Sequence, residues 1–126
     1  MENHTHIFQL NDGPFKAIAN GTKTIEMRLF DEKRQQIRVG DPITFSNTDA
    51  PEQQIRAIVK ELHVFSSFEE LYQKLPLEQC GYLPEEIPTA SPRDMEAYYP
   101  AEKQKQYGVL GIELQLLSAL RQSLTD

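Results

Sequence analysis

The sequence contains no tryptophan and a single cysteine, Cys80, and both scarcities narrow what the chain can be. One cysteine excludes a disulfide framework or a Cys-based zinc site within the chain. No apolar run approaches the roughly 18 residues of a membrane-spanning helix, and the N-terminal MENHTHIF lacks the apolar centre of a signal peptide. We therefore expect a cytoplasmic protein without a membrane partner.

Familiar catalytic and metal-binding patterns are also missing. The sequence has no Gly-rich phosphate loop and nothing resembling G-x-S-x-G or H-E-x-x-H. His4 and His6 share one face of a predicted strand, but no third ligand is marked, and His63 lies in an apolar run typical of a core position. Ser66 and Ser67 are better explained as a helix cap than as a nucleophile. We expect no metal and no cofactor.

Charge is unevenly distributed along the chain. The net charge is −6, which argues weakly against broad, nonspecific binding of nucleic acid. Yet the segment 16–38 holds six basic and three acidic residues, whereas 52–102 holds ten acidic and four basic ones. The segment 16–38 is either ordinary surface charge or a positive face that folding brings together.

Length and hydrophobic periodicity predict one α+β domain over 1–126, with a polar C-terminal tail at 118–126. The predicted order is strand, short helix, three strands, two helices and a final strand. Strands are expected at 4–10, 22–30, 42–47, 55–65 and 109–117, and helices at 14–21, 66–75 and 91–99, with one or two further turns over 101–108. The segments 48–53 and 76–90 are interpreted as loops. Short helices and dominant strands favour a small antiparallel or mixed β-barrel with helices outside it or at one end.

The strand at 22–30 carries the main candidate site. Alternation puts its apolar side chains on one face and its polar ones on the other, Thr24, Glu26 and Arg28. This polar face is either a solvated surface with ion pairs or, with Lys23, part of a binding site. Ideal alternation puts Lys23 on the opposite face, so convergence requires a twist or bulge at the strand start.

Further candidates flank this strand and precede the last one. Lys33 and Arg34 extend the charged surface into the following loop, where binding groups often lie. Converging Lys, Arg and Glu side chains would suit an anionic ligand, with the carboxylate reading an amino group of a base. Tyr98 and Tyr99 could stack on bases while Lys103 meets a phosphate. Alternatively, one tyrosine packs into the core and the other covers a helix end.

These residues resemble a known family. The stretch from Gly21 to Arg28 reads G-x-K-x-x-E-x-R, it follows a predicted helix and precedes Val-Gly-Asp, and Tyr107–Ile112 reads YGVLGI near the end. In this pattern and position the chain resembles the ASCH domain over about residues 4–117. The resemblance implies a PUA-like fold and a cleft lined by Lys23, Glu26 and Arg28.

The resemblance also implies a class of function. ASCH domains are generally thought to act on RNA or nucleotides, often as binding modules, and some members are acetylcytidine amidohydrolases or have been proposed as ribonucleases. The amidohydrolases use a Lys and, three residues later, a Thr nucleophile, with an acidic partner farther along. Glu26 stands at the position of that Thr, and the region of the acidic partner offers Asp94, Glu96 and Glu102.

Three hypotheses follow. The first is a domain that binds RNA or a nucleotide in a Lys/Glu/Arg-lined cleft. The second is a small hydrolase of modified nucleosides or RNA, in which Glu26 is a general base and Lys23 stabilises the developing oxyanion. The third is a regulatory or protein-interaction domain that meets its partner through the acidic segment 52–102.

Overall fold

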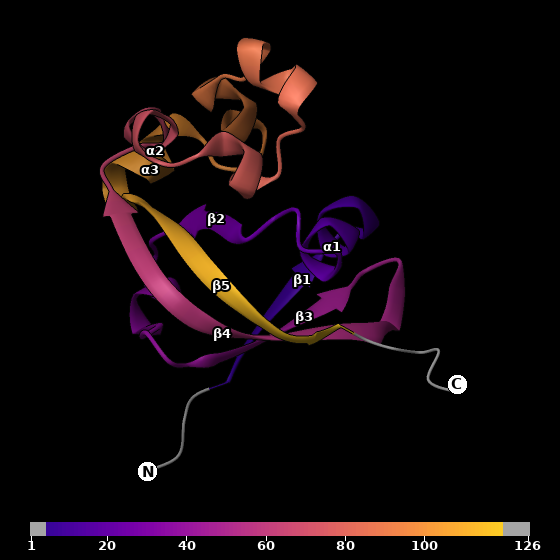
Figure 1. Ribbon diagram of the computed structural model, residues 1–126. Helices are drawn as coiled ribbons and strands as arrows, with labels where there is room; N and C mark the ends of the chain where they lie inside the picture. Colours follow the sequence, from indigo (N-terminus) through magenta and orange to yellow (C-terminus); the bar gives the residue numbers. More distant parts are fainter. Residues whose placement is uncertain (1–4, 120–126) are drawn as a thin grey trace.

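The computed structural model describes residues 5–119, with side chains up to residue 117, and its strands form a curled five-stranded sheet (Figure 1). The strands are β1 (His6–Leu10), β2 (Ile25–Leu29), β3 (Pro42–Asn47), β4 (Ala50–Phe65) and β5 (Val109–Ala119). The α-helices are α1 (Asp12–Ala19), α2 (Phe68–Lys74) and α3 (Ala101–Tyr107). Short 3₁₀ helices are η1 (Arg34–Gln36), η2 (Leu77–Cys80), η3 (Pro84–Thr89) and η4 (Pro92–Ala97).

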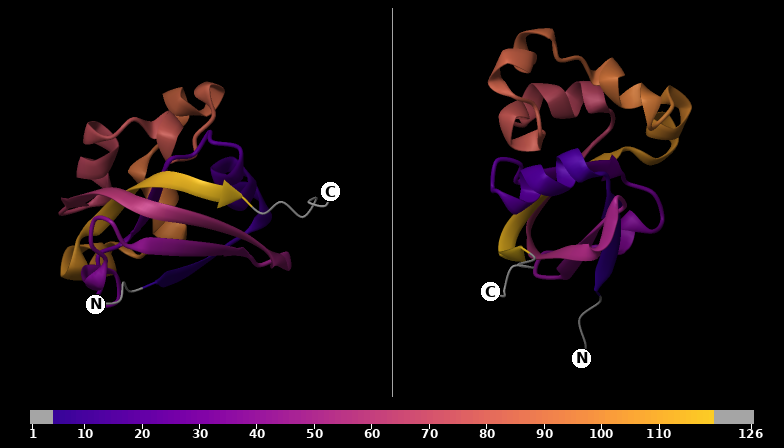
Figure 2. Two further views of the ribbon diagram at one scale, coloured as in Figure 1. Left: turned by 60° about the horizontal axis from the view of Figure 1, so that its bottom comes forward. Right: turned by 90° about the vertical axis from the view of Figure 1, so that its right-hand side faces the viewer.

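The strand order explains how the sheet closes on itself. It runs β1-β3-β4-β5-β2, with β1 parallel to β3 and every other neighbouring pair antiparallel. The strands β1 and β2, consecutive in the sequence, therefore form the two edges. Figure 2 shows the sheet curling into a half-barrel, with α1 and the segment 68–107 on the same side of it. This confirms the predicted α+β barrel-like fold with short helices.

Two apolar clusters hold these layers together. The larger fills the half-barrel and contains Phe8 and Phe45, whose rings meet edge to face with centroids 5.6 Å apart. The smaller joins the sheet to the helical segment 68–107 through Phe68 and Leu71 of α2, packed against Leu29 of β2. The helices thus lie over β2, and they cover a strand that forms one edge of the sheet.

The predicted cap at Ser67 and stop at Gly108 are confirmed, whereas α1 begins and ends two residues before the predicted helix at 14–21. Ser67 caps α2 by accepting a hydrogen bond from the Glu70 amide at 3.2 Å. Gly108 ends α3 with φ +78°, a conformation that side-chain-bearing residues rarely adopt. A Cβ at Gly108 would also lie 2.9 Å from the backbone oxygen of Phe65, so glycine is required there for two separate reasons.

Several expectations are corrected. The segment 48–53 is not all loop, because β4 already begins at Ala50, and the predicted helix at 91–99 and the loop at 76–90 contain 3₁₀ turns instead. The apolar residues of the first strand predicted burial on much of both faces, but only one face is buried, since Ile7 is exposed. His63 is half-buried and not in the core: it pairs with Glu113 at 2.6 Å. His4 and residues 120–126 of the predicted tail lie outside the described residues.

No helix within residues 5–119 has the length and apolar character needed to cross a membrane.

Candidate ligand-binding cleft

A buried carboxylate, Glu26, is the centre of the site. Its residue surface is only 3% exposed, although Glu26 belongs to the polar face of β2. Its Oε2 accepts a hydrogen bond from Arg28 Nε at 2.7 Å, and its Oε1 lies 2.9 Å from Lys23 Nζ in an ion pair. The side chains of Lys23 and Arg28 are 11% and 14% exposed. The polar face is therefore a covered ion-pair network and not a solvated strand surface.

Lys23 reaches Glu26 because it precedes the regular strand. The strand β2 begins at Ile25, so period-two alternation does not govern the orientation of Lys23. The preceding backbone is held by η2 and the turn after α1: Thr24 N donates to Gln79 O at 2.9 Å, and Lys23 N donates to Ala17 O at 3.0 Å. An irregular start to β2 thus supplies the departure from ideal alternation that convergence requires.

Arg28 connects the two edges of the sheet. Besides binding Glu26, its guanidinium donates to the backbone oxygen of Gln9 on β1 at 3.4 Å and lies 4.5 Å from the centroid of the Phe8 ring. Arg34 approaches the same ring at 5.4 Å and pairs with Asp31 at 3.3 Å. Each cation–π contact of this kind is worth about 0.5–2 kcal/mol, depending on desolvation.

The two cations keep Glu26 ionised. Burial raises the pKa of Glu26, but the positive charges of Lys23 and Arg28 and their hydrogen bonds lower it, and the balance lies below the ordinary value. Counting the three side chains, two cations and one carboxylate leave a single positive charge. The site is therefore suited to an electron-rich ligand atom that approaches Lys23 or Arg28.

Two adjoining cavities open beside this network. The Arg28 compartment, of about 350 Å³, is lined by Glu26 and Arg28 of β2, by Gln9 and neighbours on β1, and by Tyr99. The Asp94 compartment, of about 510 Å³, is lined by residues of α1, η2, η3 and η4, including Asp94. Five residues line both: Pro14, Lys23, Met27, Met95 and Tyr98. We call the two compartments together the cleft, which lies between the half-barrel and the segment 68–107.

The paired tyrosines have different environments. Tyr98 is 71% exposed and lines both compartments, so its ring is available to a ligand. Tyr99 is half-buried and stacks on Phe68 with ring centroids 5.9 Å apart. Burial raises the pKa of the Tyr99 hydroxyl. Tyr99 therefore combines a packing role with a place in the wall of the Arg28 compartment.

A chain of hydrogen bonds fixes one wall of the Asp94 compartment. The hydroxyls of Tyr72 and Tyr82 lie 2.7 Å apart, and Tyr82 donates to Asp94 Oδ2 at 2.7 Å. The Ser91 amide donates to the same oxygen at 3.1 Å. These two hydrogen bonds lower the pKa of Asp94, whereas burial and the hydrogen bonds to Tyr72 and Asp94 raise the pKa of Tyr82.

The other candidate residues do not join this group. Lys33 and Lys103 are exposed, and Lys103 Nζ lies 5.8 Å from the ring centroid of Tyr107. Glu96 lines a separate cavity beside α2 and α3, and Glu102 is exposed. Lys33, Arg34, Lys103 and Glu102 line neither compartment of the cleft.

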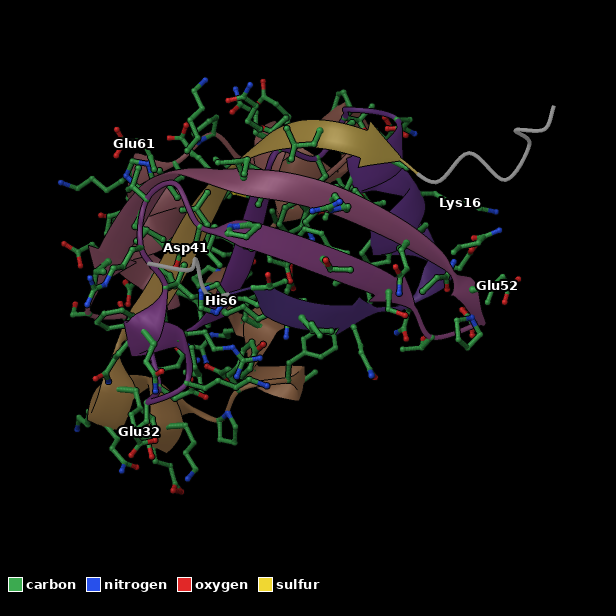
Figure 3. All side chains as sticks on the ribbon, turned by 90° about the horizontal axis from the view of Figure 1, so that it is seen from below. His6, Lys16, Glu32, Asp41, Glu52 and Glu61 are labelled. Carbon is green, nitrogen blue, oxygen red and sulfur yellow. The ribbon has the colours of Figure 1, made fainter. Side chains whose placement is uncertain are left out.

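The basic segment 16–38 is dispersed by folding. Lys16 on α1 pairs with Asp12 at 3.2 Å, and Figure 3 shows Lys16 and Glu32 at opposite sides of the molecule. Lys23 and Arg28 lie in the cleft. The segment therefore does not form one positive face.

Sequence reasoning missed much of the cleft wall, including Cys80, Tyr82 and Met95. Burial raises the pKa of the Cys80 thiol to about 11, so it is protonated at neutral pH. Cys80 and Tyr82 come from the segment interpreted as loop, where no alternation indicates which side chains face inward. Gly81 between them has φ +113°, a conformation that favours glycine, and it was one signal of a tight turn in this segment.

The described residues show no metal centre. Within residues 5–119, no three His, Cys, Asp or Glu side chains cluster in a way that could hold an ion. His6 instead bonds to Asp41 at 2.8 Å, which ties the start of β1 to the turn before β3, as Figure 3 shows.

Comparisons with known proteins give the family and the fold. A family model described as ASCH domain matches residues 9–118, whereas no curated protein matches the chain. The crystal structure of hypothetical protein PH0355 is 31% identical, covers 90% of this chain and 100% of its own, and superposes with a TM-score of 0.74. A solution NMR structure of a protein from Pyrococcus furiosus is 33% identical, with coverages of 90% and 98% and a TM-score of 0.67.

A more distant structure shares the fold alone. The crystal structure of ASCH from Zymomonas mobilis is 16% identical, covers 93% of this chain and 71% of its own, and has a TM-score of 0.63. Together these matches agree with the PUA-like α+β architecture expected from the sequence.

Proposed function

Because this chain belongs to the ASCH domain family, we propose that it binds RNA or a free nucleotide in the cleft. The observation that carries the proposal is the buried Glu26, held between Lys23 and Arg28 in the wall of an open cavity. Burying three charged groups is costly unless they are well paired, and such groups are common at sites that bind polar ligands. The compartment volumes lie within the usual range for small-ligand sites, roughly 300–1,000 Å³.

Each polar group has a role in this proposal. Lys23 supplies a positive charge where the two compartments meet, and it can contact a phosphate or a base carbonyl. Arg28 uses Nε for Glu26 and one terminal nitrogen for Gln9. Its guanidinium has five N–H donors, so donors remain for a ligand oxygen. Glu26 orients both cations.

Tyr98 supplies an aromatic surface for a base. Its exposed ring lines both compartments, next to Lys23. Stacking of a base on such a ring is worth about 1–3 kcal/mol and tolerates any base, because every base has a π-face. A nucleotide that places its base on Tyr98 and its acceptor oxygens near Lys23 uses both features at once.

Binding is favoured over hydrolysis by the state of Glu26. A general base must accept a proton from water, and it works best when its pKa is close to the working pH. Both oxygens of Glu26 contact cations, and its pKa lies below the ordinary value. Glu26 is thus a weak base, and its geometry suits positioning of Lys23 and Arg28.

The proposal is tested by titrating a labelled single-stranded oligoribonucleotide over a range of salt concentrations. Lys23→Met removes the charge and keeps most of the aliphatic stem, whereas Lys16→Met removes the same charge from exposed α1, outside the Arg28 compartment. We expect Lys23→Met to weaken binding and to lower the slope of log K against log salt by about 0.7, one single-strand phosphate contact. Lys16→Met should retain wild-type affinity. Equal affinity of both variants and wild type at every salt concentration would contradict the proposal.

A further inference from the structure

A buried side-chain amide, that of Gln104 on α3, lies behind the aromatic wall of the cleft. The residue is 8% exposed, it lines neither compartment, and it borders the separate cavity beside α2 and α3. Burying an amide is costly unless its donor and acceptor groups find partners. The groups that Gln104 binds therefore indicate why a polar side chain is buried at this position.

The amide of Gln104 binds both members of an aromatic pair. Its Oε1 accepts a hydrogen bond from the backbone amide of Phe68, at the start of α2, at 3.3 Å, and its Nε2 donates to the backbone oxygen of Tyr99 at 3.0 Å. The rings of Phe68 and Tyr99 stack on each other. The reverse orientation of the amide would face a donor with a donor and an acceptor with an acceptor. One side chain thus joins α2 and α3 to the turn at Tyr99.

This turn carries Tyr98 into the cleft. The backbone amides of Tyr98 and Tyr99 both donate to the oxygen of Met95, at 3.0 and 2.8 Å, which fixes the turn on the side of η4. The bond from Gln104 to the Tyr99 oxygen fixes the turn on the side of α3. The ring of Tyr98 is exposed and meets the Tyr99 ring at a tilt, with centroids 6.5 Å apart. The position of the Tyr98 ring therefore depends on Tyr99 and on the backbone that carries both.

We infer that Gln104 is a positioning residue whose amide holds the turn at Tyr98 and Tyr99, so that the Tyr98 ring stays in the wall of the cleft. This inference rests on the proposed function, in which the Tyr98 ring stacks on a base. Gln104 touches no ligand and acts through Tyr98. A ring that is already in place loses less conformational freedom when a ligand binds, so a firmly held turn raises affinity.

The first measurement needs no RNA. Because the chain contains no tryptophan, the Tyr98→Trp protein has a single indole, and its fluorescence anisotropy reports how freely that position moves. Gln104→Met keeps the length of the side chain and removes both hydrogen bonds. Gln106→Met is the matched control, because Gln106 is exposed on the same helix. We expect Gln104→Met to lower the anisotropy and Gln106→Met to leave it unchanged, each measured well below the urea midpoint of the variant.

A second variant separates the two hydrogen bonds and serves if Gln104→Met does not fold. Gln104→Glu retains an acceptor for the Phe68 amide, but it faces the Tyr99 oxygen with a carboxylate oxygen and so loses the donor. It should lower the anisotropy as Gln104→Met does, with Gln106→Glu as the control that gains the same charge. Wild-type anisotropy in folded Gln104→Glu overturns the inference.

The second measurement is affinity for the single-stranded oligoribonucleotide at one salt concentration. We expect Gln104→Met to weaken binding roughly fivefold, the factor that corresponds to one net hydrogen bond. In the Tyr98→Ala background the same substitution should change affinity by less than about twofold, because Gln104 acts through the ring that is missing. A general loss of structure would weaken binding equally in both backgrounds, and that result overturns the inference.

The outcomes separate this inference from the proposed function. Weaker binding by Lys23→Met, together with wild-type anisotropy and affinity in both Gln104 variants, overturns the inference and leaves the proposed function standing. Lower anisotropy without any loss of affinity also overturns it. Failure of wild type to bind any oligoribonucleotide overturns the proposed function and, with it, the inference. Lower anisotropy together with a loss of affinity that disappears in the Tyr98→Ala background supports the inference.

Discussion

Arg28 donates to the backbone oxygen of Gln9 at 3.4 Å, so a side chain from one edge of the sheet meets the backbone of the other edge. The same guanidinium contacts Glu26 and the ring of Phe8. The ion-pair network thus has a structural role beside its proposed binding role, and the two roles can be tested separately.

Glu26→Gln is expected to destabilise the fold by about 3–5 kcal/mol, because it leaves Lys23 and Arg28 covered without their counter-charge. The measurement is the free energy of unfolding in urea. Glu52→Gln is the matched control: Glu52 is exposed at the end of the molecule opposite Glu61 in Figure 3. If Glu26→Gln changes the unfolding free energy as little as the control does, the ion pairs of Glu26 contribute little to stability.

The same residue predicts a dependence of stability on pH. Because the folded-state pKa of Glu26 lies below its ordinary value of 4.5, its stabilising contribution is fully present above about that pH. The contribution is lost as the pH falls through the lower, folded-state pKa. Urea unfolding between neutral and acidic pH should therefore show a steeper loss for wild type than for Glu26→Gln. Parallel curves for the two proteins would contradict the assignment.

Tyr98→Ala and Tyr99→Ala are expected to separate binding from stability. Tyr98 is exposed, so its removal should leave the unfolding free energy within about 0.5 kcal/mol of wild type, while RNA affinity falls by about 1–3 kcal/mol. Tyr99 stacks on Phe68, so its removal should destabilise the fold by about 2–4 kcal/mol. Thermal unfolding measures the stability of the two variants, and titration with RNA measures their affinity. An RNA affinity of Tyr98→Ala equal to wild type would exclude a stacking role for Tyr98.

Gly108→Ala is expected to destabilise the domain by about 1–3 kcal/mol or more, because alanine is strained at φ +78° and its Cβ would press on the Phe65 carbonyl. Gly13→Ala provides the contrast. Gly13 lies in α1 with no atom within 4 Å of an added Cβ, so alanine there should be neutral or stabilising. Urea midpoints measure both; similar shifts in the two variants would contradict the geometric argument.

Cys80 should react slowly with a thiol-specific reagent in the folded protein at pH 8. Burial raises the pKa of its thiol to about 11, so the thiolate is scarce until the pH approaches that value. The labelling rate should increase sharply when the protein is unfolded in urea at the same pH. Equal rates for folded and unfolded protein would show that the thiol is accessible and ordinary.

Local patterns predicted the framework but not the cleft. Period-two alternation located β2, β3 and β5, and the serine cap located α2, because these signals depend on neighbouring residues. The burial of Glu26 depends on β1 and the helical segment 68–107, which are distant in the sequence. Alternation identifies a polar face, but only tertiary contacts decide whether it faces water.

Irregular backbone explains the other differences between the predictions from sequence and the structure. Pro51 favoured a loop, yet β4 includes it because the register shifts between Ser46 and Asn47 on the neighbouring strand. Lys23 precedes β2, so period-two alternation does not predict the direction of its side chain. Tyr82 lies between η2 and η3, and Asp94 lies in η4, where no repeating pattern indicates direction. Their hydrogen bond therefore depends on tertiary packing, including that of η4 against α2.

The strand order has a consequence for the stage of folding at which the site forms. β1 and β2 are consecutive in the chain but lie at opposite edges of the sheet, separated by β3, β4 and β5. The wall shared by Gln9 and Arg28 can form only when the last strand of the chain has taken its place between β4 and β2. Contacts this distant in sequence form slowly. Acquisition of ligand binding would therefore report the end of folding, and a chain truncated before β5 would lack the site even if its first strands were paired.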